Sequence, residues 1–203
     1  MSKIEVILIR HGKTIANEKR LYCGKTDLSL SDNGIEELKK LKESLNYPKC
    51  DKYYTSGAKR ANETFKILYG NNDFIELRGF FEYDFGEFEM KSYEDLKEDE
   101  RYIEWITDKS GEIRCPKGES KNTYKKRIRE QFISFIKDIN NKKINSALLI
   151  SHGGTIGTIL EEFYDNSKNF YTWQPSFGQG YKITVEFLNN KFEITKVEDI
   201  KNI

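Results

Sequence analysis

The chain has 203 residues and a mass of 23.9 kDa, with a formal net charge of +1 and charged residues of both signs mixed along its length. A chain of this length can bury a sizeable apolar core, so we expect one domain over residues 1–203. The balanced charge provides no field that would attract nucleic acid or anionic lipid, and we expect neither nucleic acid nor a membrane as a partner.

The periodicity of apolar residues predicts strands that alternate with helices. Ile4–Ile9 and Ala147–Ile150 are short continuous apolar runs, a pattern typical of strands that helices cover on both faces. Between these runs we expect a helix that begins at Ser31 or Asp32 and ends before Pro48, a strand at Asp51–Tyr54, a helix at Lys59–Tyr69 and a strand at Phe74–Leu77. Short helices at Tyr93–Lys97 and Tyr102–Thr107 and a long helix at Glu119–Asn140 are expected next. Near the end of the chain, Tyr181–Leu188 and Lys191–Val197 are expected to form an antiparallel hairpin around Asn189-Asn190. This order predicts an α/β fold, a three-layer α/β/α sandwich with a mostly parallel central sheet.

Two aromatic segments are expected to belong to the core. The long helix carries Tyr124, Phe132 and Phe135 at helical spacing, and we expect this face to be core rather than a cofactor site. The segment Phe170–Tyr181 is likewise expected to pack the core rather than to cover a site. No segment suggests a bound cofactor, and we expect none.

The cysteines and the N-terminal hydropathy bear on the compartment. Cys23, Cys50 and Cys115 include no C-x-x-C pair and are odd in number, which argues against a disulfide framework and against a zinc ribbon. The run Ile4–Ile9 contains a glutamate and is followed by Arg10, unlike a signal peptide, and no later stretch reaches the roughly 18 apolar residues that span a bilayer. We expect a cytoplasmic protein.

The two histidines of the chain each follow an apolar strand. His11 lies in the stretch ILIRHGKT and His152 in the similar stretch LLISHGGT. In an open α/β sheet, ligands bind beyond the carboxyl ends of the strands, and the glycine after each histidine permits a tight turn and a close approach to a ligand. Thr14 or Thr155 can begin the next helix, whose first N–H groups favour an anion. We therefore expect both histidines in one site, at the ends of neighbouring strands.

Gly-Lys-Thr occurs twice in the chain and invites comparison with a nucleotide-binding P-loop. The copies are Gly12–Thr14 and Gly24–Thr26. The upstream glycine that a P-loop requires is Ile7 for the first copy and Lys19 for the second. ATP binding of this type is therefore not expected.

The arginines near these motifs favour an anion as the ligand. Arg10 beside His11 would repel a metal cation, and the H-x-x-x-H spacing of helical zinc sites is absent, so we expect no metal. Arg60 lies near the start of the helix that follows the strand Asp51–Tyr54, again at the edge where ligands bind. Guanidinium groups match phosphate oxygens in geometry and charge, so two arginines and two imidazoles suit a phosphate dianion.

Several separate motifs resemble those of the histidine phosphatases, also called the phosphoglycerate mutase-like superfamily. They are RHGKT at Arg10–Thr14 with Asn17, GKTDLSLSDNG at Gly24–Gly34, TSGAKRANET at Thr55–Thr64, EYDFGEFE at Glu82–Glu89, PKGES at Pro116–Ser120 and SHGGT at Ser151–Thr155. They extend from the start of the chain to about residue 160 in the order of the family. The resemblance implies a phosphoglycerate mutase-like fold.

The resemblance also implies a phosphohistidine mechanism without metal, in which fixed cations stabilise the phosphoryl oxygens. The implied site residues are His11 as nucleophile, Glu82 as general acid, His152 as a further catalytic group, and Arg10, Asn17, Arg60 and Gly153 as phosphate-binding residues. Three carboxylates near Glu82 are fallback candidates for the general acid, namely Asp84, Glu87 and Glu89.

Two positions depart from the family pattern. Gly57-Ala58 stands where the family usually has Pro-Leu, and Met90 stands where it often has Gly. Neither change removes a catalytic group, although both can alter loop stiffness or the shape of the pocket.

We expect a phosphomonoesterase that acts on a small phosphorylated metabolite. Mutases of the superfamily resemble the same core but are typically longer, so hydrolysis is favoured and phosphoglycerate mutase is the alternative. A second alternative is a phospho-ligand binder without activity, and the joint presence of His11 and Glu82 counts against it. The stretches YCGKTD and FEMK resemble the ribazole phosphate phosphatases of cobalamin assembly. The sequence leaves the oligomeric state open.

The expected mouth of the site is rich in aromatic residues. Phe80, Phe81, Tyr83 and Phe85 lie there together with Asp84. This composition suggests a small-molecule phosphate monoester with little charge beyond its one phosphate.

Overall fold

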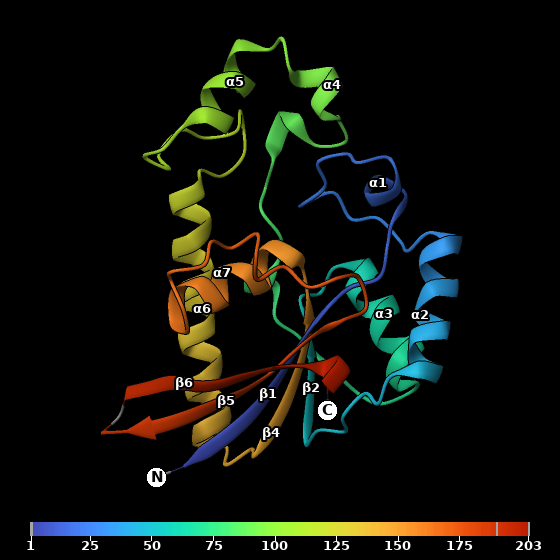
Figure 1. Cartoon of the computed structure of the whole chain (residues 1–203), viewed down its shortest axis with the longest axis vertical. Helices are drawn as coiled ribbons and strands as arrows, with labels where there is room; N and C mark the ends of the chain where they lie inside the picture. The colour runs from blue at the N-terminus through green and yellow to red at the C-terminus, as the bar shows by residue number, and fades with distance from the viewer. Residues whose placement is uncertain (1, 190, 203) are drawn as a thin grey trace.

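A mixed six-stranded sheet lies at the centre of the molecule (Figure 1). The computed structural model describes residues 2–189 and 191–202, so Asn190 of the expected hairpin turn lies outside the described residues. The strand order is β3-β2-β4-β1-β5-β6. The strands are β1 (Lys3–Arg10), β2 (Lys52–Thr55), β3 (Ile75–Glu76), β4 (Ser146–Ser151), β5 (Gly180–Leu188) and β6 (Lys191–Asp199). Strands β1 to β4 pair in parallel, and β5 pairs antiparallel with both β1 and β6.

Helices cover both faces of this sheet, which confirms the expected three layers. In Figure 1, α2 and α3 lie to one side of the sheet and α6 and α7 to the other. The helices are α1 (Ile15–Glu18), α2 (Asp32–Ser44), α3 (Lys59–Tyr69), α4 (Tyr93–Leu96), α5 (Glu100–Thr107), α6 (Lys121–Asn141) and α7 (Gly153–Phe163), with single 3-10 turns at Arg78–Phe80, Gly86–Phe88 and Ile200–Asn202. No helix in the described part of the chain has both the length and the hydropathy that crossing a bilayer would need.

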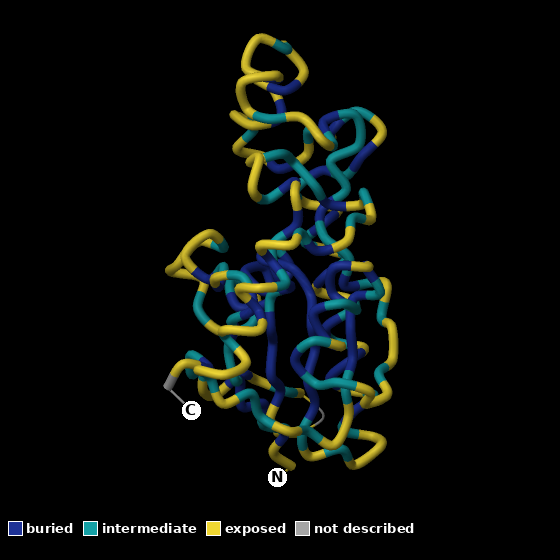
Figure 2. The backbone as a smooth tube through the Cα atoms, turned by 90° about the vertical axis from the view of Figure 1, so that its right-hand side faces the viewer, coloured by how far each residue is buried: buried dark blue, intermediate teal, exposed yellow. Residues whose placement is uncertain are grey.

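The residues of β1 are divided between the two cores because successive side chains of a strand point to opposite faces. Val6 and Leu8 belong to the core that contains the apolar residues of α6 and α7. Ile7 and Ile9 belong to the core that contains those of α2 and α3. The backbone tube in Figure 2 accordingly shows buried strands running through the middle of the molecule. This two-sided burial explains the continuous apolar run.

The register of β1 and β4 brings the two histidines together. Arg10 pairs with Ser151 at the end of the parallel ladder, so the next residue of each strand is a histidine. The ladder continues for one bond further, since the N–H of His11 donates to the carbonyl of Ser151 at 3.0 Å. The expectation that both histidines follow neighbouring strands is confirmed.

A projection that contains α4 and α5, residues 85–119, extends beyond the carboxyl ends of the strands (Figures 1 and 2). We call this segment the α4–α5 lobe. The loop after α1 attaches to it, because the N–H of Tyr22 donates to Lys91 and the N–H of Met90 donates to the carbonyl of Tyr22. Helix α5 begins earlier than expected because Asp99 caps it, accepting a hydrogen bond from the N–H of Arg101.

Candidate active site

His11 and His152 lie side by side beyond the carboxyl ends of β1 and β4. Their ring centroids are 5.1 Å apart, in an edge-to-face arrangement. His152 is fully buried and His11 is 5% exposed. The two rings thus form the floor of a site at the edge of the sheet where ligands bind in α/β folds.

The tautomer of His11 is fixed by one hydrogen bond. Its Nδ1 lies 2.6 Å from the carbonyl oxygen of Gly12, which can only accept, so Nδ1 carries the hydrogen and Nε2 carries the lone pair. Burial lowers the pKa of His11 well below its usual value, and the charges of Arg60 and Arg10 lower it further, against the opposing effect of the Gly12 bond. The ring is therefore neutral, with an unprotonated Nε2 that can act as a nucleophile.

Arg60 supplies a buried positive charge from the first turn of α3. The side chain is 1% exposed, and its two terminal nitrogens donate to the carbonyl oxygens of Gly24, at 2.7 Å, and Thr26, at 3.1 Å. These acceptors are neutral, and the described residues provide no carboxylate as an ion-pair partner. The positive charge of Arg60 therefore remains available to a ligand.

Arg10 supplies a second positive charge from the end of β1. One terminal nitrogen donates to the carbonyl of Pro175 at 2.9 Å, and the guanidinium carbon lies 3.8 Å from the centre of the Phe177 ring. Burial lowers the pKa of Arg10, and the negative charge of Glu82 partly opposes this effect. Arg10 and Glu82 are therefore close enough to interact.

Several buried polar atoms at this site have no hydrogen-bond partner among the described residues. They include both ring nitrogens of His152, Nε of Arg10 and Oγ of Ser151. Buried polar groups in folded proteins are nearly always bonded, so such a cluster indicates a ligand. Burial lowers the pKa of His152 well below its usual value, as do the charges of Arg60 and Arg10. An anion with several oxygens would satisfy these groups together.

Glu82 lies at the same site and is held by three donors. Its Oε1 accepts from the hydroxyl of Tyr124 at 2.6 Å and from the N–H of Tyr83 at 3.0 Å. Its Oε2 accepts from the N–H of Gly154 at 2.9 Å, in the first turn of α7. These contacts fix the carboxyl group beside the histidines without involving a cation that would have to be displaced.

The other carboxylates of the same loop are engaged elsewhere. Asp84 forms an ion pair with Lys25, and Glu87 forms ion pairs with two cations of the α4–α5 lobe. Glu89 accepts backbone hydrogen bonds, as described below. The geometry therefore favours Glu82 over the three fallback candidates as the proton donor of the site.

Two adjacent glycines allow Arg10 and Glu82 to approach α7. A Cβ atom on Gly153 would lie 2.9 Å from the guanidinium carbon of Arg10. A Cβ atom on Gly154 would lie 2.6 Å from Oε1 of Glu82. The sequence His-Gly-Gly thus places a cation and an acid next to His152, where a larger side chain would displace one or the other.

Glu89 organises the loop that holds Arg60. Its two carboxylate oxygens accept from the backbone N–H groups of Gly24, Lys25 and Thr26, and Oε1 also accepts from Phe85. The carbonyls of Gly24 and Thr26 face the opposite way and accept from Arg60. Glu89 is therefore a positioning residue, which acts on the site through the loop 24–26.

Asn17 belongs to the cap of α1, and Thr155 lies within α7 rather than at its start. Oδ1 of Asn17 accepts from the N–H and hydroxyl of Thr14, in the capping box of α1, so its amide nitrogen is the group that remains for a phosphate. Thr155 does not begin a helix, because α7 starts at Gly153 with His152 as its N-cap. Its hydroxyl instead lies 3.1 Å from the hydroxyl of Tyr124.

The segment 170–181 both packs the core and covers the site. Trp173 is buried in the core, as expected. The expectation is wrong for Pro175 and Phe177, because Pro175 accepts from Arg10 and the Phe177 ring lies 6.0 Å from that of His11. The sequence offers no signal for this, since the contact between Arg10 and Pro175 joins residues 165 positions apart.

Tyr124 is the other site residue that the sequence pattern conceals. Its ring is buried in the core, as the apolar spacing of α6 predicts, but its hydroxyl reaches Glu82. Burial and the charge of Glu82 raise the pKa of Tyr124 well above its usual value, so this hydroxyl stays protonated and donates.

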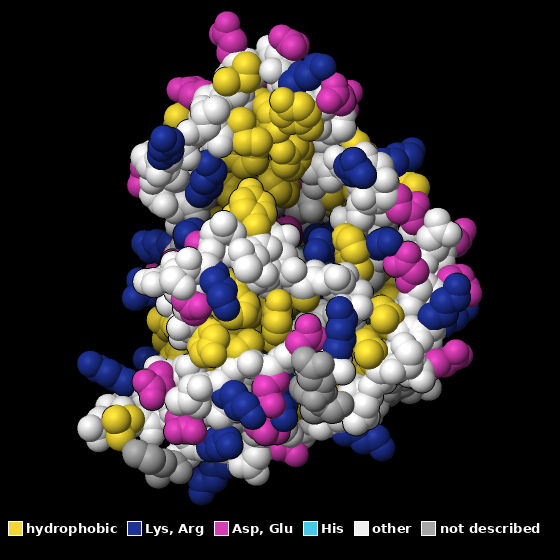
Figure 3. Space-filling view, in the orientation of Figure 1, with side chains coloured by type: hydrophobic (Ala, Val, Ile, Leu, Met, Phe, Trp, Pro, Cys, Tyr) yellow, Lys and Arg dark blue, Asp and Glu magenta, His cyan; other side chains and the backbone are white. Residues whose placement is uncertain are grey.

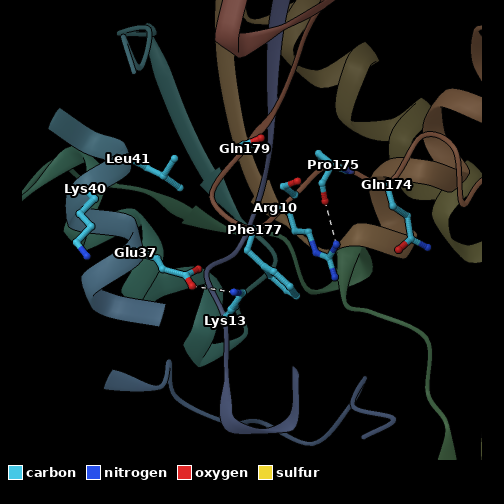
Figure 4. Close-up of a pocket in the computed structure, with 10 residues that line it drawn as sticks. Arg10, Lys13, Glu37, Lys40, Leu41, Gln174, Pro175, Phe177 and Gln179 are labelled. Atoms are coloured by element: carbon cyan, nitrogen blue, oxygen red, sulfur yellow. Dashed lines mark hydrogen bonds and ion pairs between the residues drawn. The ribbon is translucent and has the colours of Figure 1, made fainter. Parts of the chain in front are cut away.

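A cavity of about 590 Å³ opens beside Arg10 rather than over the histidines (Figure 4). It lies between α2 and the segment that contains Pro175 and Phe177. Lys13 and Lys40 contribute positive charge to its wall, and Lys13 forms an ion pair with Glu37 at 2.7 Å. The wall of the cavity beyond Arg10 therefore carries Lys40 and the paired charges of Lys13 and Glu37. Within residues 2–189 and 191–202, no group of three or more His, Cys, Asp and Glu side chains is arranged to hold a metal ion.

Comparison with known proteins connects this geometry to a family. A model of the histidine phosphatase superfamily (branch 1) matches residues 6–200. The adenosylcobalamin/alpha-ribazole phosphatase of Salmonella typhimurium LT2 is 29% identical over 157 residues, which cover 75% of this chain and 76% of the relative. The alpha-ribazole phosphatase from Shigella flexneri aligns in structure with a TM-score of 0.79 at 23% identity, over 97% of each chain. A phosphoglycerate mutase from Bacillus anthracis aligns with a TM-score of 0.73 at 20% identity, over 98% of this chain and 94% of the mutase.

Proposed function

The chain belongs to the histidine phosphatase superfamily (branch 1), and we propose that it is a metal-independent phosphomonoesterase that works through a phosphohistidine on His11. The observation that carries the proposal is the neutral His11 ring, with its lone pair at Nε2, beside the partly buried positive charge of Arg10 and the buried positive charge of Arg60. A nucleophile, cations for the phosphoryl oxygens and a carboxyl group at one site are the parts that phosphoryl transfer requires.

The proposed substrate is a small phosphate monoester, with α-ribazole phosphate as the first candidate. Support comes from a relative named adenosylcobalamin/alpha-ribazole phosphatase, which is similar over three quarters of the chain. Phosphoglycerate mutase is the second candidate, because a mutase also shares the fold. The two candidates differ in whether the phosphoryl group ends on water or on the substrate.

Substrate binding places the phosphoryl group over His11. Arg10, Arg60 and one ring N–H of His152 donate to its oxygens, and the amide nitrogen of Asn17 adds a further donor. Gly153 leaves room for this approach beside Arg10. The donors are positioned before the substrate arrives, so little reorganisation is needed when charge develops on these oxygens.

In the first step, Nε2 of His11 attacks phosphorus in line with the leaving oxygen. Glu82, a carboxylate in the free site, takes up a proton with the substrate, because the phosphate dianion places a like charge beside it. The P–N bond forms as the P–O bond to the leaving group breaks, and the leaving oxygen takes this proton from Glu82. Nδ1 keeps its hydrogen, which it still donates to the Gly12 carbonyl, and this bond stabilises the positive charge that the ring acquires.

In the second step, a water molecule attacks the phosphohistidine. Glu82, now a carboxylate, takes a proton from the water, the P–N bond breaks, and phosphate leaves. His11 returns to the neutral form with its lone pair on Nε2, and Glu82 is again protonated. The same carboxyl group thus serves as acid and then as base.

We place this reaction in the cytoplasm. The three cysteines are free thiols, and burial raises the pKa of Cys50 and of Cys115 to about 12, so both stay protonated and unreactive. Thiols of this kind suit a reducing compartment.

The test combines phosphorus NMR with trapping of the intermediate. In the presence of a chelator, the wild type should release inorganic phosphate from α-ribazole phosphate, and base-stable label should remain on the protein after a rapid quench with labelled substrate. His11→Ala should abolish both signals. Formation of 2-phosphoglycerate from 3-phosphoglycerate would instead make the protein a mutase. Binding of inorganic phosphate without turnover of either substrate would make it a binder.

A further inference from the structure

A continuous group of aromatic rings lies on the α4–α5 lobe, on the loop attached to it and on residue 83, just before the lobe. We call Tyr22, Tyr83, Phe85 and Trp105 the aromatic wall. The Tyr83 and Phe85 rings are 4.9 Å apart, the Phe85 and Tyr22 rings are 5.0 Å apart, and Trp105 lies within 6.0 Å of all three. On the face shown in Figure 3, hydrophobic side chains form a patch over the lobe that reaches toward the middle of the molecule.

The aromatic wall begins at the proposed proton donor. Tyr83 follows Glu82 in the chain and donates its N–H to Oε1 of that residue. Phe85 is only two residues further along. Because Glu82 must reach the leaving oxygen, the rest of the leaving group has to extend on this side of the site. The first surface that it meets there is aromatic.

Only part of the wall is accessible to a ligand. Tyr83 and Trp105 are buried, as is Phe80, so these residues form the backing of the wall rather than its surface. Tyr22 and Phe85 are partly exposed and present their rings at the surface. Phe81 is also partly exposed, and its ring lies 5.8 Å from that of His152. Of the expected aromatic mouth, Phe81 and Phe85 therefore remain accessible, and Phe85 is the one that belongs to the wall.

An exposed aromatic residue lies on the loop that covers the site. Tyr171 is 72% exposed, and its ring packs on that of Phe170 with centroids 4.0 Å apart. Its charge when ionised would be among those that raise the pKa of Tyr22, so the two side chains lie within electrostatic reach of each other. The same loop carries Pro175, the acceptor for Arg10. Wall and loop thus face each other at the entrance.

The charges around the site are distributed unevenly. On the side of the wall, Lys25 is paired with Asp84, and the carboxylate of Glu89 is satisfied by backbone N–H groups. On the opposite side, beyond Arg10, the cavity is lined by Lys13, which pairs with Glu37, and by Lys40, which forms no ion pair among the described residues. A leaving group with a carboxylate or a second phosphate would find few free cations on the side of Glu82.

Resting on the proposed phosphatase function, we propose that the leaving alcohol of the substrate carries a planar aromatic ring that stacks on Phe85 and Tyr22. Tyr171 lies over the other side of this ring. Ring pairs at such distances favour aromatic over aliphatic ligands by a modest factor, roughly three- to tenfold in kcat/KM. α-Ribazole phosphate belongs to this class, since its base is a benzimidazole.

The test compares three primary alkyl phosphates whose leaving oxygens are alike in acidity. They are 2-phenylethyl phosphate, 2-cyclohexylethyl phosphate and n-butyl phosphate. We expect kcat/KM to be highest for the phenylethyl ester, and we expect Phe85→Leu to remove most of this preference. Tyr171→Ser, at a position that is 72% exposed, should reduce the same preference. Tyr164→Leu, at a partly exposed aromatic residue that packs on Trp173, is the control and should keep it.

The outcomes separate this inference from the function on which it rests. Equal kcat/KM for the phenylethyl and cyclohexylethyl esters would overturn the inference that the leaving group carries a planar aromatic ring. A preference that survives both Phe85→Leu and Tyr171→Ser would overturn the assignment of its binding site to the aromatic wall. Either result leaves the phosphatase activity intact. Failure of all three esters and of α-ribazole phosphate to release phosphate would overturn the proposed function, and the inference with it.

Discussion

The rings of His11 and His152 meet edge to face, with centroids 5.1 Å apart, and the buried guanidinium group of Arg60 and the partly buried one of Arg10 lie beside them. Burial and the two positive charges make a further proton on either ring unfavourable. Both histidines are therefore neutral in the folded protein. The arrangement keeps a lone pair on His11 while it concentrates positive charge for an anion, and it links the stability of the fold to pH.

Stability should fall as the pH is lowered through the range in which free histidine titrates. The pKa of His11 and of His152 is lower in the folded than in the unfolded chain, so below about pH 6.5 the unfolded chain binds more protons. The free energy of unfolding should decrease there by up to about 1.4 kcal/mol per pH unit for each histidine. Urea unfolding between pH 7.5 and 5.5, in buffer without phosphate, measures this slope. His152→Gln should reduce the slope, and equal slopes in both proteins would contradict the prediction.

Glu82→Gln should slow the reaction most for substrates whose leaving group has to be protonated as it departs. Glutamine keeps the shape of the side chain but cannot donate a proton to the leaving oxygen. We expect kcat/KM for an alkyl phosphate to fall by roughly 10²- to 10⁴-fold. With p-nitrophenyl phosphate, whose leaving group is stable as an anion, the loss should be much smaller. An equal loss for both substrates would argue against Glu82 as the general acid.

Substitution of Gly153 or Gly154 in α7 by alanine should impair the reaction in two different ways. Gly154→Ala places Cβ against Glu82 and should reproduce the selective loss for alkyl phosphates. Gly153→Ala places Cβ against Arg10 and should mainly weaken binding, seen as a higher KM and weaker inhibition by inorganic phosphate. Alanine is the better helix former by about 1 kcal/mol, so neither loss should come from an unstable α7. Identical kinetic profiles for the two variants would contradict this division.

The sheet and most of the proposed site could be predicted because they depend on local patterns. Continuous apolar runs mark β1 and β4, and a histidine at the end of each run must lie at the ligand-binding edge. Arg60 could be placed in the same way, from the strand that precedes its helix. The parallel register, in which Arg10 pairs with Ser151, then brings these side chains together.

Tyr124, Pro175 and Phe177 could not be predicted because their roles depend on tertiary contacts. Tyr124 satisfies the apolar spacing of α6 equally well with or without a partner for its hydroxyl. Pro175 and Phe177 reach Arg10 only because a long loop turns back over the site. Glu89 differs from its neighbours for a similar reason, since the turn around Gly86, with φ of 54°, decides where each carboxylate of this segment points.

Glu89→Gln should weaken phosphate binding although Glu89 does not contact the ligand. Glutamine retains one oxygen acceptor, so part of the bonding to the loop 24–26 is lost and Arg60 loses its fixed position. We expect weaker inhibition by inorganic phosphate and a loss of stability of about 1–3 kcal/mol. Glu87→Gln is the matched control, two residues away, because Glu87 forms only exposed ion pairs and should change neither quantity measurably. Equal effects of both variants would show that Glu89 has no special role.

Met90 marks a position where the chain carries strain that glycine would relieve. Its φ is 61°, in the left-handed region that side chains disfavour, and its N–H donates to the carbonyl of Tyr22 at 2.7 Å. The family often has glycine here, consistent with the backbone that the loop requires. Met90→Gly and Met90→Ala remove nearly the same side chain, but only glycine removes the strain, so the glycine variant should be more stable by about 1 kcal/mol. Urea unfolding of the two variants measures this difference in stability. In a helix interior the alanine variant would be the more stable of the two, so the expected sign is reversed here. An alanine variant as stable as the glycine variant would contradict the assignment of strain.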